Sequence, residues 1–478
     1  MLGTARAAHI HGVGRIRRAP RAQRPGGTRS GEARPRAARA GAGLLGAGLA
    51  LALLGGAGGS GGVADTAGSG ATAIGTSGAR VSVDADSGSS DCTANGGTRI
   101  AQTPPALAQL QSELAWGVSR GTGVVVAVVD SGVDARNPHL AGVLAGGVDL
   151  VGDGAGQNGY ADLDGHGTAI AGQIAARTID GSGVQGLAPE ARILSVRVFS
   201  TTEQDARKAG YGPTIPRIAE GIRVAADANA QVINVSLSSA SDAPELRDAV
   251  AYATARGSLV VASSGNADNS QSVEEKASGA ARYPAGDPGA LGSGAVDAAG
   301  AADGNSVNGP HVSIAAPGQN IVTSASNGID CVYSSDAAHT SFSTAYVSAA
   351  AALVAAAHPQ ETPAQWKYRL EATAVRPDPD RRDDAIGWGV VQPYDAMTLA
   401  VGGALRGPES AFGGGTASPP ADDQRDLALA HSDPASTLAT TISIVGAVAA
   451  AAVLGVVGVL GYYRRRRRAE ESPDEFGV

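Results

Sequence analysis

The sequence contains few cysteines and few aromatic residues, and each shortage excludes a class of protein. Two cysteines in 478 residues are too few for a disulfide-rich scaffold or a cysteine-based zinc site. Aromatic residues make up 4% of the chain and hydrophobic residues 43%, so a core must consist mainly of Ala, Val, Leu and Ile. Glycine is abundant at 68 residues but follows no G-x-y period, which excludes a collagen-like chain. We therefore expect a globular protein with glycine in linkers and tight turns.

Much of the positive charge lies at the two ends of the chain. Ten arginines fall in residues 1–40, and five consecutive arginines occupy residues 464–468. Subtracting these 15 from 37 basic residues leaves 22, and subtracting the five acidic residues of the ends from 45 leaves 40, so residues 41–463 carry about −18. This acidic body argues against nucleic acid as a partner.

The N-terminal segment has the pattern of a secretory signal peptide. Arginine-rich sequence precedes the apolar run 41–57, and small residues follow it. We predict that residues 1–64 form a signal peptide with a long arginine-rich n-region; an uncleaved anchor is the alternative.

A second apolar segment lies near the C-terminus. Residues 440–463 carry no charge, and a helix of this length spans a hydrocarbon core of about 30 Å. The following arginines are typical of a stop-transfer cluster that stays cytoplasmic. We predict a transmembrane helix over 438–463 and a cytoplasmic tail over 464–478; a buried core helix is the alternative. The expected protein is a single-pass protein of the cell membrane with its body outside the cytoplasm.

Two linkers rich in small residues flank one large domain. Residues 65–100 are predicted to be a flexible extension and residues 401–437 a Gly/Pro/Ser linker. Within the domain, residues 101–400, apolar runs without polar alternation indicate strands buried on both faces. Helical patterns separate several of these runs, which predicts an α/β fold with a doubly wound, mostly parallel sheet flanked by helices. The strand runs are 123–130, 193–199, 232–237 and 258–262, and the clearest helical patterns are 215–229 and 245–256.

Three short motifs contain residues suited to nucleophilic catalysis. Asp130 follows the first strong strand, and Ser341 heads a long Ala-rich helix. His166 lies at a helix start between two glycines, which let the backbone approach closely there. Each has an ordinary structural explanation, since Asp caps turns, His is found in cores and Ser caps helices. Their order along the chain, Asp then His then Ser, is the order of the subtilisin triad.

The segments around these residues resemble the Asp-box, His-box and Ser-box of the subtilase family, peptidase family S8. The resemblance covers about residues 120–375 and also includes residues 235–238, 263–266 and 315–318. It implies a subtilisin-like serine endopeptidase in which His166 is the general base, Asp130 orients it and Ser341 attacks the substrate. It further implies that Asn266 serves the oxyanion hole. The implied substrate-binding residues are Ser236, Leu237, Ser238, Ser264 and Gly265, with the first three pairing with the substrate as an added strand.

The expected organisation resembles that of the mycosins, which are membrane-anchored proteases associated with type VII secretion. It consists of an exported subtilase domain, one C-terminal membrane helix and a basic stop-transfer cluster. The implied partners are a protein or peptide substrate, the cell membrane and a type VII secretion complex. The alternative is a weakly active or inactive protease-fold subunit that supports such a complex. Two departures from the subtilase Ser-box, His339 and Ala345, bear on this choice, and Ser343 is a second, less fitting nucleophile.

Residues 58–98 are too rich in Gly and Ser to form a packed prodomain, so we expect an extension that does not inhibit. Deleting residues 65–90 is then expected to leave basal activity unchanged. Because export favours oxidation, we predict a disulfide between Cys92 and Cys331; two free thiols are the alternative. No cofactor or metal is expected, because the acidic residues before His166 lack an ordered ligand pattern and are interpreted as solvated loop charges. These residues are Asp149, Asp153, Asp162 and Asp164.

Overall fold

The computed structural model describes residues 81–83, 99–156, 158–267, 281–402, 405–413 and 459–465. The predicted signal peptide lies outside these residues, as do most of the predicted linker and membrane helix. Of the segment predicted to cross the membrane, residues 459–463 are described and are helical.

A parallel sheet of seven strands forms the centre of the domain. The strand order is β3-β4-β2-β5-β7-β8-β9, and every neighbouring pair runs parallel. This confirms the predicted mostly parallel α/β fold. The strands are β2 (Val125–Asp130), β3 (Leu144–Asp149), β4 (Arg192–Arg197), β5 (Val232–Val235), β7 (Leu259–Ser263), β8 (Leu291–Val296) and β9 (Ile314–Pro317).

Strand β2 shows why these runs lack polar alternation. Val126 and Val128 belong to the core cluster on one face of the sheet, while Ala127 and Val129 belong to the cluster on the other face. Both faces are covered by helices, so every side chain of the strand interior is apolar.

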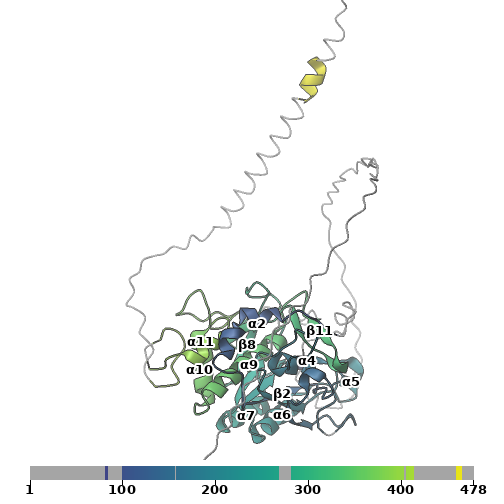
Figure 1. The fold of residues 1–478 in the computed structure, drawn as a ribbon, viewed down its shortest axis with the longest axis vertical. Helices are drawn as coiled ribbons and strands as arrows, with labels where there is room; N and C mark the ends of the chain where they lie inside the picture. Colours follow the sequence, from purple (N-terminus) through teal and green to yellow (C-terminus); the bar gives the residue numbers. More distant parts are fainter. Residues whose placement is uncertain are drawn as a thin grey trace, which may run out of the picture. The chain divides into compact units, whose positions relative to one another are not determined.

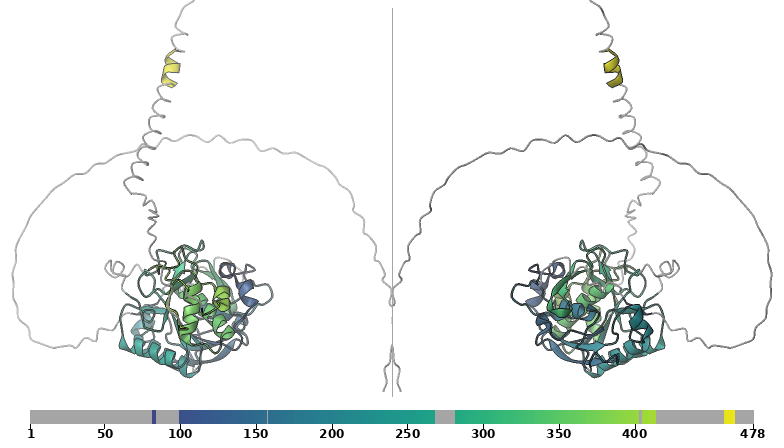
Figure 2. Two further views of the ribbon diagram at one scale, coloured as in Figure 1. Left: turned by 90° about the vertical axis from the view of Figure 1, so that its left-hand side faces the viewer. Right: turned by 90° about the vertical axis from the view of Figure 1, so that its right-hand side faces the viewer.

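Helices cover the sheet on both sides (Figure 1). Helices α6 and α7 pack on one face, and the teal segment that contains them lies at one edge of the domain in both side views of Figure 2. Helices α4 and α9 pack against each other on the other face. The helices are α2 (Pro105–Gln109), α3 (Ser112–Trp116), α4 (His166–Ala175), α5 (Gln204–Lys208), α6 (Ile215–Asp227), α7 (Pro244–Ala255), α9 (Thr340–Ala357), α10 (Pro363–Thr373) and α11 (Pro393–Thr398), with 3₁₀ turns at Pro138–Leu140 and Ser326–Gly328.

Helix α9 is the central helix of the domain. Among the described residues it is the helix whose length and composition would suit a membrane span, but 89% of it is buried inside the protein. Its small alanine side chains let it pack closely against the sheet and against α4. It is therefore a core helix.

Two small antiparallel pairs complete the described structure. β10 (Ile321–Ser324) pairs with β11 (Asp330–Tyr333), and β1 (Val81–Val83) pairs with β6 (Leu237–Ser239). β1 belongs to the segment predicted to be a flexible extension.

Candidate active site

Three neighbouring strands of the sheet, β2, β5 and β7, end at the same edge. Asp130 is the last residue of β2, Ser236 follows β5 directly, and Asn266 lies three residues after β7. In open parallel sheets, ligands bind beyond the carboxyl ends of the strands. The topology thus brings these predicted site residues to one edge of the sheet.

Asp130 and His166 form a buried hydrogen-bonded pair. His166 Nδ1 lies 2.8 Å from Asp130 Oδ1, and neither side chain is more than 1% exposed. The backbone N–H of Ser131 donates to the same carboxylate oxygen at 2.8 Å. The carboxylate is therefore fixed by the backbone, and it in turn orients the imidazole.

The two glycines beside His166 make this approach possible. Gly165 has a φ of 92°, a conformation that favours glycine. At Gly167 an added Cβ would lie 2.0 Å from the carbonyl oxygen of Gly132, which follows β2. The start of α4 therefore contacts the turn after β2 through backbone, as expected from the Gly-His-Gly sequence.

Asp162 fastens the loop that carries His166. It accepts hydrogen bonds from the backbone N–H groups of Gly165 (2.7 Å) and Thr168 (2.8 Å) and from the Ser131 hydroxyl (2.8 Å). Burial raises the pKa of Asp162, while these donors oppose the increase. The interpretation of Asp162 as a solvated charge is wrong, because the residue is an acceptor that closes the loop.

The other acidic residues of this loop are also engaged with the protein. Arg197, which is fully buried, pairs with Asp149 at 2.8 Å and with Asp153 at 2.6 Å. The hydrogen bond from Arg197 lowers the pKa of Asp153. Asp164 accepts from the N–H of Thr202 at 3.2 Å, and burial raises its pKa to about 6. The solvated-loop interpretation is therefore wrong for these residues as well, since a carboxylate pairs with a cation or becomes easier to protonate when buried.

Ser341 is the second residue of α9 and is fully buried. The hydroxyl of Ser236 donates to the Ser341 carbonyl oxygen at 2.9 Å. The next residue, Phe342, packs its ring 5.6 Å from the His166 ring, and Gln173 of α4 donates to its carbonyl oxygen at 3.1 Å. The ring contact places Phe342, the residue after Ser341, against His166, and the hydrogen bond joins Phe342 to α4.

Asn266 is fixed at the head of the same helix. Its side-chain oxygen accepts from the N–H and from the hydroxyl of Thr340, both at 3.0 Å. Thr340 directly precedes Ser341, so these two hydrogen bonds tie Asn266 to the residue before the predicted nucleophile.

The two departures from the subtilase Ser-box do not disturb this helix. His339, the N-cap residue, has φ −116° and ψ 134°, an extended conformation open to any residue. Ala345 lies inside an unbroken helix. Ser343 bonds to the Ser293 hydroxyl at 2.7 Å and to the N–H of Ala316 at 3.1 Å, so its side chain faces the sheet. Ser343 is therefore a structural residue.

The predicted substrate-binding residues gather beside Asn266. Leu237 and Ser238 belong to β6, and a Cβ on Gly265 would lie 2.8 Å from the Ser238 hydroxyl. Ser264, the residue before Gly265, is buried. Arg282, which is not among the predicted residues, is 2% exposed, and its Cγ lies 3.4 Å from the same Cβ position. The sequence around a single arginine does not indicate where it will lie in the fold. In the structure, Arg282 brings a cation beside the predicted substrate-binding residues.

Cys331 is buried in β11 and is not a free thiol. Cys92 lies outside the described residues, so the predicted disulfide stays a prediction.

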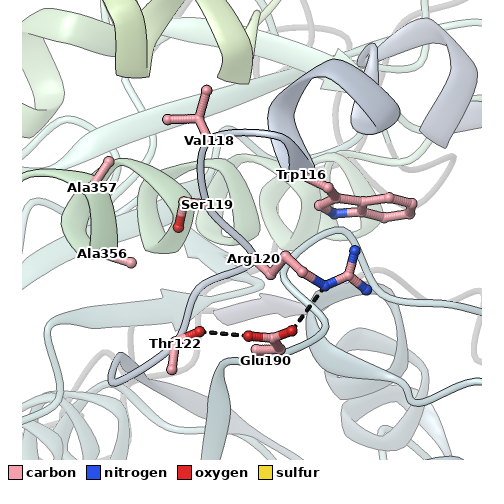
Figure 3. A pocket seen from close by; sticks show the side chains of 8 residues that line it. All are labelled: Trp116, Val118, Ser119, Arg120, Thr122, Glu190, Ala356 and Ala357. Atoms are coloured by element: carbon pink, nitrogen blue, oxygen red, sulfur yellow. Dashed lines mark hydrogen bonds and ion pairs between the residues drawn. The ribbon is translucent and has the colours of Figure 1, made fainter.

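Figure 3 shows a shallow pocket, whose volume is about 360 Å³. Trp116, Arg120 and Glu190 line it, with Arg120 over the Trp116 ring and 2.9 Å from Glu190. Ala357, the last residue of α9, also lines it. Since α9 rises about 1.5 Å per residue, this pocket lies roughly 24 Å from Ser341, so it is not part of the candidate active site.

Comparison with known proteins agrees with this geometry. The subtilase family matches residues 121–389, a range that includes Asp130, His166, Asn266 and Ser341. The chain belongs to the subtilase family of serine proteases. It is 43% identical over 162 residues to thermitase from Thermoactinomyces vulgaris, covering 34% of this chain and 54% of thermitase.

The chain is also similar to the mycosins. It is 34% identical over 351 residues to mycosin-1 from Mycolicibacterium smegmatis, covering 66% of this chain and 76% of mycosin-1. The crystal structure of MycP1 from Mycobacterium smegmatis matches with a TM-score of 0.55 and 32% identity over 66% of this chain and 90% of that chain. This subtilase is therefore of the mycosin type. The chain spans about half the length of thermitase and of a thermophilic serine proteinase from Bacillus, and about three quarters of mycosin-1.

Proposed function

We propose that this protein is a serine endopeptidase that hydrolyses peptide bonds through Asp130, His166 and Ser341. The observation that carries the proposal is the buried 2.8 Å hydrogen bond between Asp130 and His166 beside the head of α9. Membership of a serine protease family supports the same reaction.

In the proposed mechanism, His166 Nε2 takes the proton of the Ser341 hydroxyl as Oγ attacks the substrate carbonyl carbon. Asp130 holds Nδ1 protonated and stabilises the imidazolium that forms. Asn266 Nδ2 and the N–H of Ser341 donate to the oxyanion. The imidazolium then gives its proton to the leaving amine, and a water molecule repeats the sequence to release the acyl group. Asp130 and His166 are already buried and hydrogen-bonded to each other.

The test is labelling of the whole protein with a serine-directed fluorophosphonate, followed by mass analysis of the labelled peptide. We expect one label, on Ser341, and none on Ser341→Ala. Cleavage of a peptide substrate is expected to disappear in the same variant. A label on Ser343, or equal cleavage by the protein and by Ser341→Ala, would remove Ser341 as nucleophile.

The alternative is a protease-fold subunit that supports a secretion complex without catalysis. The mycosin MycP1 is described as an essential component of the type VII (ESX-1) secretion system, which is why a supporting role is the competing function. Intact geometry around His166 and an uninterrupted α9 favour activity. An unlabelled protein that still assembles with a secretion complex would favour the supporting role.

We further propose that the protein is anchored in the cell membrane by residues 438–463, with the protease domain outside the cytoplasm and residues 464–478 inside. The uncharged run and the five arginines support this topology. Protease digestion of intact cells is expected to remove the domain and to spare the C-terminal tail. Digestion of the tail in intact cells would overturn this topology.

A further inference from the structure

Arg282 is a buried cation beside two of the predicted substrate-binding residues. It is 2% exposed, although arginine is among the residues that are rarely buried in proteins. A Cβ added to Gly265 would lie 3.4 Å from Arg282 Cγ, 3.5 Å from Arg282 Nε and 2.8 Å from the Ser238 hydroxyl oxygen. The arginine side chain and this hydroxyl therefore both lie against the side of Gly265 where a side chain would be.

The backbone at this point is held by the fold. Gly265 has a φ of 87°, in the left-handed region that favours glycine. Its carbonyl oxygen accepts a hydrogen bond from the N–H of Val307 at 2.8 Å, and the carbonyl oxygen of Ser264 lies 3.1 Å from His311 Nε2. These contacts fix the segment that leads to Asn266, so the surroundings of Gly265 are preformed.

Arg282 supplies positive charge in this region, and the neighbouring histidine does not. Burial, to which the charges of Arg282 and Arg382 add, lowers the pKa of His311 to about 4. His311 is therefore neutral at pH 7, whereas an arginine stays protonated. An anion beside Gly265 is thus attracted by Arg282 and not by His311.

The proposed mechanism brings the substrate close to these residues. In that mechanism Asn266 donates to the oxyanion formed at the attacked carbonyl, and Gly265 directly precedes Asn266. The substrate residue that carries this carbonyl has its Cα one bond away from the carbonyl carbon. Its side chain is therefore within reach of the Gly265 backbone and, through the predicted pairing of the substrate with β6, of Ser238.

The chemistry of Arg282 and Ser238 favours a carboxylate at this position. A guanidinium presents five N–H donors in a planar fork that matches a carboxylate, and a hydroxyl can donate as well. Because a guanidinium has five donors, a partner within the protein leaves others available for a ligand. A buried cation is stabilised by an opposite charge, and it disfavours a second cation beside it.

We propose that Arg282, assisted by the Ser238 hydroxyl, makes the protease cleave after acidic residues. The proposal rests on the proposed function, in which Asn266 holds the oxyanion and β6 binds the substrate. It names the class of substrate, which is peptides with Glu or Asp directly before the cleaved bond. Arg282 is a specificity-determining residue, and it takes no part in the proton transfers of His166.

The test uses two peptides that differ only in the residue before the cleaved bond, which is Glu in one and Gln in the other. The two side chains have nearly the same size and shape, so the ratio of the two kcat/KM values measures recognition of the charge. A hydrogen bond to a charged group corresponds to roughly a 10- to 100-fold effect. We expect the full chain to prefer the Glu peptide by that factor at pH 7, and mass analysis of the products identifies the cleaved bond.

Three variants show whether Arg282 causes the preference. Arg282→Gln removes the charge and is expected to cleave the two peptides equally. Arg282→Lys keeps a charge without the planar fork, so we expect a smaller preference for Glu than in the parent protein. Arg247→Gln is the control, because it removes one positive charge from a side chain that is 46% exposed and pairs with Asp242, and we expect it to keep the full preference.

A role of Arg282 in structure alone predicts a different result, since a loosened site lowers both kcat/KM values together and leaves their ratio unchanged. Arg282→Met, which keeps an apolar stem, gives the same readout where Arg282→Gln does not fold. A preference for Glu that survives in these neutral variants would overturn the role of Arg282. Equal cleavage of the two peptides by the parent protein, or a preference for Gln, would overturn cleavage after acidic residues.

Labelling of Ser341 with a fluorophosphonate separates these outcomes from failure of the proposed function, because the reagent carries no side chain to be recognised by Arg282. Normal labelling together with either contrary result would overturn the proposal about Arg282 and leave the proposed function standing. Absence of labelling in the parent protein, with no cleavage of either peptide, would overturn both.

Discussion

The side-chain oxygen of Asn266 accepts two hydrogen bonds from Thr340, one from its N–H and one from its hydroxyl, each 3.0 Å long. The orientation of the amide follows from this contact, because the acceptor oxygen is the atom that meets both donors. The donor group of the amide, Nδ2, lies 3.5 Å from Nδ1 of His339, the residue before Thr340. Asn266, which lies three residues after β7, thus contacts the two residues that precede Ser341.

Asn266→Asp is expected to lower kcat by about 10²–10³-fold, because loss of one oxyanion donor has that effect in related chemistry. The aspartate keeps an oxygen for Thr340 but replaces the Nδ2 donor with an acceptor. Steady-state kinetics on a peptide substrate measure the change.

Thr340→Val is the control for this variant. It removes one of the two hydrogen bonds to Asn266 but leaves the Nδ2 donor in place, so we expect a loss of about 10-fold or less. If both variants lose activity equally, Asn266 acts by holding the helix and not by donating to the oxyanion.

A chain of buried hydrogen bonds ends at the backbone carbonyl of Ser341. Ser348 donates to Asn234 at 2.9 Å, Asn234 to Ser236 at 3.0 Å, and Ser236 to the carbonyl oxygen of Ser341 at 2.9 Å. Ser236→Ala removes the last link and leaves a buried carbonyl with one donor fewer. We expect kcat to fall by about 10-fold with KM little changed, because the backbone of residue 236 remains available to the substrate.

Ser348→Ala cuts the same chain two helical turns from the site. It is expected to lower the melting temperature in the same way as Ser236→Ala but to have a smaller effect on kcat. An equal loss of kcat in the two variants would show that general loosening of α9 explains the result.

The sequence predicted the fold well where strands consist of β-branched residues. The run before Asp130 became β2, and the patterns at 215–229 and 245–256 became α6 and α7. Strands β3, β8 and β9 were not predicted. β8 contains Gly292 and Gly294, which have low strand propensity, yet a Cβ on Gly292 would lie 1.9 Å from the carbonyl oxygen of His311. Glycine is needed there because the backbone at His311 lies close to β8, and this contact cannot be predicted from the local sequence.

In the candidate site too, local features were predicted from the sequence, whereas contacts with distant residues were not. The Gly-His-Gly motif predicted a backbone approach at His166, because glycine permits conformations and contacts that are local. The partners of the acidic loop depended on residues far along the chain. Asp153 meets Arg197, 44 positions away, and nothing in the local sequence distinguishes it from a solvated carboxylate. Arg282 beside Gly265 was missed for the same reason.

Gly167→Ala is expected to destabilise the protein and to reduce activity strongly. The added Cβ would lie 2.0 Å from the carbonyl oxygen of Gly132, so α4 must move away from the turn after β2. A clash of this kind in a packed core costs on the order of 2–4 kcal/mol. Thermal unfolding and peptide cleavage measure the two effects.

Gly304→Ala is the matched control for this substitution. Nothing lies within 4 Å of a Cβ at Gly304, so we expect less than about 0.5 kcal/mol of change in the free energy of unfolding. A stable and fully active Gly167→Ala would show that the contact between α4 and the turn after β2 is not needed to place His166.

Asp164 is expected to make stability depend on pH between about 4 and 6. Burial raises its pKa to about 6 in the folded protein, above the ordinary value of 3.8. A group with a raised folded pKa stabilises the protein fully below pH 3.8, and this contribution is lost as the pH rises through 6. Asp164→Asn removes the carboxyl group and with it this loss of stability. At pH 7 the variant is therefore expected to be more stable than the parent protein by on the order of 2 kcal/mol.

The two proteins are expected to have equal stability at pH values below the ordinary aspartate pKa, where both side chains are neutral. Asp205→Asn is the control, because the Asp205 side chain is 96% exposed and its removal is expected to have no such effect. A stability difference for Asp164→Asn that does not vary with pH would contradict a raised pKa of Asp164 in the folded protein.

The predicted disulfide between Cys92 and Cys331 is testable by alkylation under non-reducing conditions. Cys331 is buried and is not free, and the chain has one other cysteine, so we expect both thiols to resist alkylation until a reductant is added. Closing a loop of this length contributes about 5 kcal/mol on the chain-entropy model. Cys92→Ser is therefore expected to lower the melting temperature. Cys331→Ser breaks the same bond from the other side and is expected to lower the melting temperature by a similar amount. A lower melting temperature in only one of the two variants would show that the change comes from the substituted side chain and not from the lost disulfide.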